Sequence, residues 1–99
     1  MKIEKDKFSL VRMDRAGVFF GHIEEVDDKH IVMTNVRKIY YWAKAACVEQ
    51  LAVDGEGDTR NAKYTIRVDR LMMMDKAIQI FECTDKATKS LNEVPEWKM

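Results

Sequence analysis

Residues 37–42, which read Arg-Lys-Ile-Tyr-Tyr-Trp, hold the densest group of side chains that could bind a ligand. A nucleobase stacked on an aromatic side chain gains about 1–3 kcal/mol, and a guanidinium donates paired hydrogen bonds to phosphate. This pattern predicts a site for a small nucleotide. The candidate stacking residues are Tyr40, Tyr41 and Trp42, with Phe20 as a further option, and the candidate phosphate ligands are Arg37, Lys38 and Arg67.

The same segment also fits an ordinary strand of a protein core. Alternation along a strand divides its residues between two faces, with Lys38, Tyr40 and Trp42 on one and Arg37, Ile39 and Tyr41 on the other. In this interpretation the aromatic rings pack inside, while the stems of Arg and Lys extend toward solvent.

Phe19, Phe20 and His22 form a second aromatic segment together with Gly17 and Gly21. A glycine at position 21 would let a flat ligand approach the backbone closely. The alternative is a core strand with a bulge at Gly21.

Residues for catalysis or metal binding show no recognisable spacing. If a general base exists, His22 or Glu24 is the best candidate. Cys47 and Cys83 stand far apart and form no metal-ligand pattern with the two histidines, so we expect reduced thiols in a cytosolic protein. We therefore assign no catalytic residue, no metal and no cofactor, and an enzyme is the less favoured class.

The charge balance limits the kind of partner. The 99 residues carry 17 Lys+Arg and 17 Asp+Glu, a formal net charge of zero. A protein that binds DNA or RNA polymers by phosphate neutralisation is not expected, nor is a polybasic membrane-binding surface. A neutral chain can self-associate. No apolar stretch is long enough for a membrane span or a signal peptide, so we expect a cytoplasmic protein.

The first half of the chain predicts an antiparallel meander. Residues 8–13, 18–26 and 31–42 are rich in strand-forming side chains and are separated by polar turns. The apolar pattern changes parity around Thr34 and Asn35, which predicts a bulge or bend there.

The second half predicts helices at residues 43–53 and 85–93, the latter capped by Thr84 or Asp85 and followed by Pro95. Strands are expected at 63–69 and 77–84, whereas 71–74 fits either a strand or a helical turn. The sum is a single α+β domain over residues 1–99. It is β-rich, an antiparallel sheet or barrel-like meander of five or six strands with one middle helix and a short C-terminal helix.

Self-association is favoured by two further features. Met72, Met73 and Met74 are consecutive, and a strand or helix cannot bury all three on one face. Trp97 also needs a surface to pack on, either its own sheet or a neighbouring chain. We expect a homo-oligomer, a dimer or tetramer; the alternative is a plain core with an exposed Met.

Five short motifs occur in one order over roughly residues 10–98. They are Ala16-Gly17-Val18-Phe19-Phe20-Gly21 (AGVxxG), Arg37, Ile39, Tyr41 and Trp42 (RxIxYW), Ala46, Leu51, Ala52 and Gly55 (AxxxxLAxxG), Cys83, Thr84 and Ala87 (CTxxA), and Val94, Pro95 and Trp97 (VPxW). In these motifs the chain resembles a family of small phage and prophage proteins. It departs from the family pattern after the Trp, where residues 44–48 replace Gly-Ala and small polar residues.

The resemblance implies a role by analogy with small phage proteins that act as sponges against the CBASS and Thoeris defence systems. Such proteins bind a nucleotide immune signal without cleaving it, here most simply a cyclic dinucleotide such as cyclic GMP–AMP. A protein-interaction module that inhibits a host protein through an aromatic or Met-rich surface is the alternative, because resemblance alone does not determine function.

Overall fold

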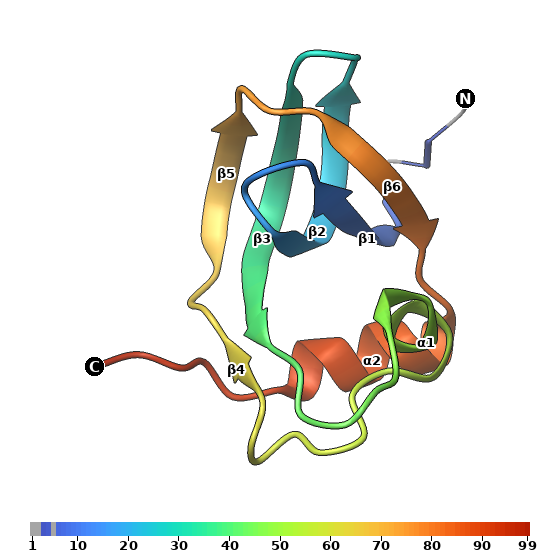
Figure 1. The fold of residues 1–99 in the computed structure, drawn as a ribbon, viewed down its shortest axis with the longest axis vertical. Coiled ribbons are helices and arrows are strands. Elements are labelled where there is room, and N and C mark those ends of the chain that lie inside the picture. The colour runs from blue at the N-terminus through green and yellow to red at the C-terminus, as the bar shows by residue number, and fades with distance from the viewer. Residues whose placement is uncertain (1–2, 5) are drawn as a thin grey trace.

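The first three strands form the predicted meander. The computed structural model describes residues 3–4 and 6–99. Strands β1 (Phe8–Met13), β2 (Val18–Val26) and β3 (Ile31–Tyr41) pair antiparallel in sequence order (Figure 1). The pairing register shifts between Phe20 and His22, and Asn35 has a φ of 47°. Both expected irregularities, at Gly21 and near Thr34 and Asn35, are therefore confirmed.

Three further strands complete the sheet at its two edges. The first half of β3 pairs with β5 (Val68–Met73) and its end pairs with β4 (Lys63–Tyr64), while β6 (Ala77–Glu82) pairs with β1. Strands β5 and β6 thus lie on opposite edges, yet only residues 74–76 connect them. Such a connection spans about 14 Å at most, so the sheet curls toward itself, as Figure 1 shows.

The predicted strand 63–69 is divided into two in the structure. The hydroxyl Oγ1 of Thr65 accepts the backbone N–H of Lys38 at 2.9 Å, and the Glu96 carboxylate accepts that of Arg67 at 2.9 Å. Side chains thus replace backbone partners around these positions and interrupt the strand. Residues 71–73 of the ambiguous methionine segment belong to β5.

Helix α1 (Val48–Asp54) begins later than the predicted helix 43–53. The backbone N–H groups of Ala43 and Lys44 donate to the Glu56 carboxylate, and that of Ala46 donates to the Gln50 side chain. These bonds hold the preceding residues outside the helix. Gly55 follows with a φ of 84°, a conformation that suits glycine after a helix.

Helix α2 (Asp85–Glu93) has the predicted bounds. The Thr84 hydroxyl oxygen accepts the N–H of Ala87 at 3.0 Å, as an N-cap should. The fold is therefore the predicted α+β domain, with one six-stranded sheet and both helices.

The curled sheet is buried on both faces. Leu10 and Phe20 belong to a core with the two helices, whereas Val11 and Phe19 belong to a second core inside the curl. In Figure 1 both helices lie at one end of the sheet. Met73 is buried in the second core, while Met72 and Met74 are exposed.

Candidate ligand-binding site

The end of β3 carries two neighbouring tyrosines that both reach the surface. Tyr40 is 59% exposed and Tyr41 51%, because the pairing of β3 with β4 shifts register between Ile39 and Tyr41. Simple alternation had placed them on opposite faces. With the half-buried Trp42 they line a hollow of about 340 Å³, which we call the aromatic hollow.

Trp97 stacks on this surface from the far end of the chain. Its ring centroid lies 4.9 Å from that of Tyr40, with an interplanar angle of 19°. The Nζ of Lys63 lies 5.4 Å from the Trp97 ring centroid, within range of a cation–π interaction. We call Tyr40, Tyr41, Trp42, Trp97 and Lys63 together the aromatic site.

Two of these residues were absent from the predicted set. Trp97 had one available signal, a large aromatic ring near the end of the sequence that needed a packing surface. Lys63 had none, because only the pairing of β4 with β3 brings it beside the aromatic rings.

Residues 94–97, which we call the tail segment, run beside β4 and place Trp97 there. Glu96 bridges to Tyr64 in parallel, and the Trp97 N–H donates to the Tyr64 carbonyl at 2.8 Å. The Glu96 carboxylate accepts the Arg67 backbone N–H. Trp97 is thus added to β4 by main-chain bonds.

Arg37 lies in the interior, where no phosphate can reach it. It is 1% exposed, and its guanidinium donates to five main-chain carbonyls, those of Tyr64, Thr65, Leu91, Val94 and Pro95. Burial lowers its pKa to about 10, so it remains a cation at neutral pH. The Arg37 side chain therefore has a structural role: it joins β3 to the end of α2 and to the tail segment.

Phe20 is also inaccessible, since it is fully buried in the core beneath the helices. A Cβ at the neighbouring Gly21 would lie 2.8 Å from the Val36 Cα. Gly21 thus permits close approach of β3 to β2. Phe20 is a core residue of this strand, as the alternative to a ligand site predicted.

The other two predicted phosphate ligands lie outside the aromatic hollow. Lys38 Nζ is 6.0 Å from the Phe19 ring centroid, and its Cε would touch a Cβ at Gly17, so it extends along β2. The Arg67 guanidinium donates to the Asn92 side chain and to the Asn35 carbonyl. Neither lines the aromatic hollow.

The buried carboxylate of Glu56 fixes the backbone next to the aromatic site. Glu56 accepts the backbone N–H groups of Ala43, Lys44 and Asp58 and the Tyr64 hydroxyl, the last at 3.1 Å. Burial and this carboxylate raise the pKa of Tyr64. Glu56 therefore fixes the chain directly after Trp42, a role that the polar loop sequence does not reveal.

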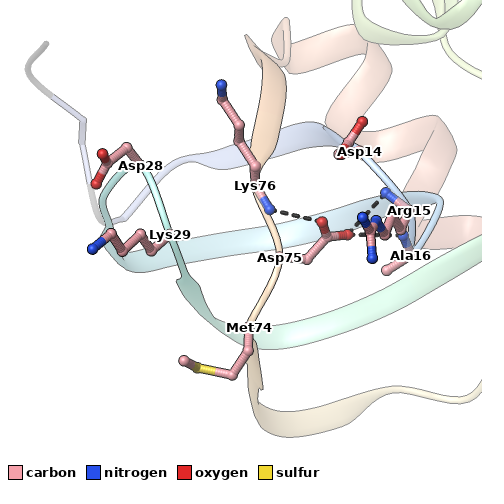
Figure 2. A pocket seen from close by; sticks show the side chains of 8 residues that line it. All are labelled: Asp14, Arg15, Ala16, Asp28, Lys29, Met74, Asp75 and Lys76. Carbon is pink, nitrogen blue, oxygen red and sulfur yellow. Dashed lines mark hydrogen bonds between the residues drawn. The ribbon is translucent and has the colours of Figure 1, made fainter.

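A second hollow, of about 530 Å³, lies where the turns after β1, β2 and β5 meet (Figure 2). Both oxygens of Asp75 are occupied there: they accept the N–H groups of Arg15, Ala16 and Lys76 at 3.0, 2.9 and 2.8 Å. These bonds, led by that of Arg15, lower the pKa of Asp75. Asp75 ties the turn between β5 and β6 to the turn after β1.

The candidate general bases lie on β2. The His22 ring packs on Phe8 with centroids 4.0 Å apart, and Glu24 forms an ion pair with Arg70 at 2.8 Å. Neither residue lines the aromatic hollow.

The described residues contain no group of three or more side chains suited to a metal, and no helix among them is long and apolar enough to cross a membrane. Cys47 is exposed and Cys83 buried, both as free thiols. Burial raises the pKa of Cys83 to about 12.

The chain is thus a small α+β domain whose curled sheet presents aromatic rings at one strand end. It belongs to the family described as a domain of unknown function, DUF6948, whose model matches residues 6–91. No curated protein and no solved structure matches the chain.

Proposed function

We propose that this protein binds a small nucleotide at the aromatic site and sequesters it without cleaving it. In biological terms the proposal is a phage-encoded anti-defence sponge in the host cytoplasm, with a cyclic dinucleotide such as cyclic GMP–AMP as ligand. The observation that carries the proposal is the exposed stack of Tyr40 and Trp97 beside the aromatic hollow.

The site offers both interactions that a nucleotide needs. Exposed tyrosine and tryptophan rings can stack on bases. Lys63 forms no ion pair with a described residue, so its ammonium is available to a phosphate in place of the buried Arg37. The hollow of about 340 Å³ lies within the range of about 300–1,000 Å³ that small-molecule sites occupy.

A cyclic dinucleotide has two bases, whereas the described part of one chain presents one aromatic hollow. A second copy of the chain would supply a second stacking surface. Nanomolar sequestration, near −12 kcal/mol, therefore favours a homo-oligomer with the ligand between two copies.

Binding without turnover fits the placement of the acid–base candidates. His22 and Glu24 lie on β2 and are engaged with Phe8 and Arg70. A nucleotide hydrolase would need a base at the aromatic hollow itself.

Calorimetry against a panel of cyclic dinucleotides tests the proposal. We expect tight binding of at least one member, and a loss of roughly 5- to 150-fold in Tyr40→Ala, since stacking one base is worth about 1–3 kcal/mol. Lys63→Ala should weaken binding and reduce its salt dependence. The matched control is Lys89→Ala, an exposed lysine on α2.

Two results would contradict the proposal. One is the absence of heat with every panel member at micromolar protein; the other is equal weakening by Lys63→Ala and Lys89→Ala. Intact ligand recovered after denaturation distinguishes sequestration from hydrolysis.

A protein-interaction module is the second candidate function. Met72, Met74 and Ile78 are exposed on β5, β6 and the turn between them, and methionine adapts to varied partner surfaces. A pull-down from infected lysate that retains one protein, and loses it with Met72→Ala and Met74→Ala together, would favour this function.

A further inference from the structure

We infer that Trp97 is a positioning residue of the aromatic site: it holds the Tyr40 ring in the orientation that receives a planar ligand. The inference rests on the proposed function for its ligand, although the contact itself can be tested alone. It gives the tail segment a role in binding.

The ring contact is direct, and Trp97 remains partly open. Tyr40 stacks on Trp97 with centroids 4.9 Å apart. Trp97 is still 42% exposed, so burial in a core does not hold its indole in place. Main-chain bonds to β4 hold it there.

A continuous set of contacts leads from the core to this ring. The Arg37 guanidinium donates to the carbonyls of Val94 and Pro95, at 2.8 and 3.3 Å. Val94 is buried in the core beneath the helices. The Glu96 carboxylate accepts the Arg67 N–H, and the Trp97 N–H donates to the Tyr64 carbonyl of β4, so the indole is anchored at its backbone.

Trp97 acts on the ligand through Tyr40. The aromatic hollow is lined by Tyr40, Tyr41 and Trp42, and Trp97 is not among its lining residues. An exposed tyrosine without a neighbour populates several rotamers, and selecting one on binding costs affinity. A ring already stacked on Trp97 has its orientation before the ligand arrives.

A double-mutant cycle on the affinity for cyclic GMP–AMP tests this role. We expect Trp97→Ala to weaken binding about 3- to 10-fold, the size of the effect of immobilising one side chain. Trp97→Phe retains a stacking ring and should restore affinity to within about 2-fold. In a Tyr40→Ala background, Trp97→Ala should have no further effect.

Three outcomes would overturn the inference. The first is that Trp97→Ala leaves binding unchanged. The second is that Trp97→Ala binds more tightly, which would make the tail segment a competitor of the ligand. The third is that Trp97→Ala loses as much affinity in the Tyr40→Ala background as in the natural chain. In each case the natural chain still binds, so the proposed function stands.

If no nucleotide binds, a measurement without ligand still tests the contact between Trp97 and Tyr40. Trp42→Phe leaves Trp97 as the single indole, because the chain has two tryptophans. Adding Tyr40→Ala should make that indole more accessible to acrylamide and raise its quenching constant about 2-fold, because a stacked face is uncovered. Tyr41→Ala is the matched control, and equal quenching in the two variants would refute the contact.

Discussion

The guanidinium of Arg37 is surrounded by neutral acceptors. Its hydrogen-bond acceptors are main-chain carbonyls of β4, of Thr65 directly after β4, of the end of α2 and of the tail segment. The last carbonyls of a helix have no partners within it, so Arg37 supplies donors that α2 lacks. Only a flat group with five N–H donors can serve all of these positions at once.

Replacing this side chain tests that role. We expect Arg37→Lys to lower the free energy of unfolding by at least about 2 kcal/mol, because lysine leaves several buried carbonyls unsatisfied. Urea unfolding measures the change. Arg60→Lys, on an exposed loop, is the control and should change stability by less than about 0.5 kcal/mol. Equal stability of the two variants would contradict the assigned role.

At the scale of elements, local patterns were sufficient for the meander and for α2. Alternation, polar turns and the Thr84 cap are all contained within short stretches of sequence. The division between β4 and β5 depends on bonds from Lys38 and Glu96, which lie far from it along the chain. The Tyr40–Trp97 stack is equally non-local, so residues 37–42 indicated three of the five residues of the aromatic site.

The N-cap of α2 offers a test at this scale. Thr84 accepts the Ala87 N–H and also donates to the Val53 carbonyl at 2.7 Å, which joins α2 to the end of α1. Thr84→Ala should destabilise the fold by about 1–2 kcal/mol in thermal or urea unfolding. Thr84→Ser retains the hydroxyl and should lose less than half of that amount. Similar losses in both variants would show that the methyl group matters more than the cap.

For the whole molecule, Asp75 holds the curl of the sheet at the turn end (Figure 2). Its carboxylate joins two turns from different parts of the chain. The connection between β5 and β6 is thereby fixed to the β1 hairpin, and the two sheet edges are held near each other at that end.

This arrangement predicts a pH dependence. Backbone hydrogen bonds lower the pKa of Asp75 in the folded protein from an unfolded value near 3.8. Its stabilising contribution is therefore complete above that value and is lost as the pH falls through the folded pKa. Asp75→Asn should lower the melting temperature at pH 7, and the difference from the natural chain should shrink below about pH 4.

Asp28→Asn is the matched control, because Asp28 lines the same hollow and no hydrogen bond or ion pair joins its carboxylate to a described residue. It should leave the melting temperature nearly unchanged at both pH values. A difference for Asp75→Asn that stays constant from pH 7 to pH 3 would contradict the assignment.

The family match ends at residue 91, whereas the Tyr40–Trp97 stack pairs a ring inside the matched region with one beyond it. Trp97 belongs to neither core. Mutation at position 97 can therefore alter the aromatic surface at little cost to folding. Under the proposed function, such a change would alter ligand preference while the domain stays the same. Within the tail segment, Val94 is buried and Arg37 bonds to the Val94 and Pro95 carbonyls. Position 97 is therefore the place where evolution, or an engineer, could change the proposed binding surface and leave the fold intact.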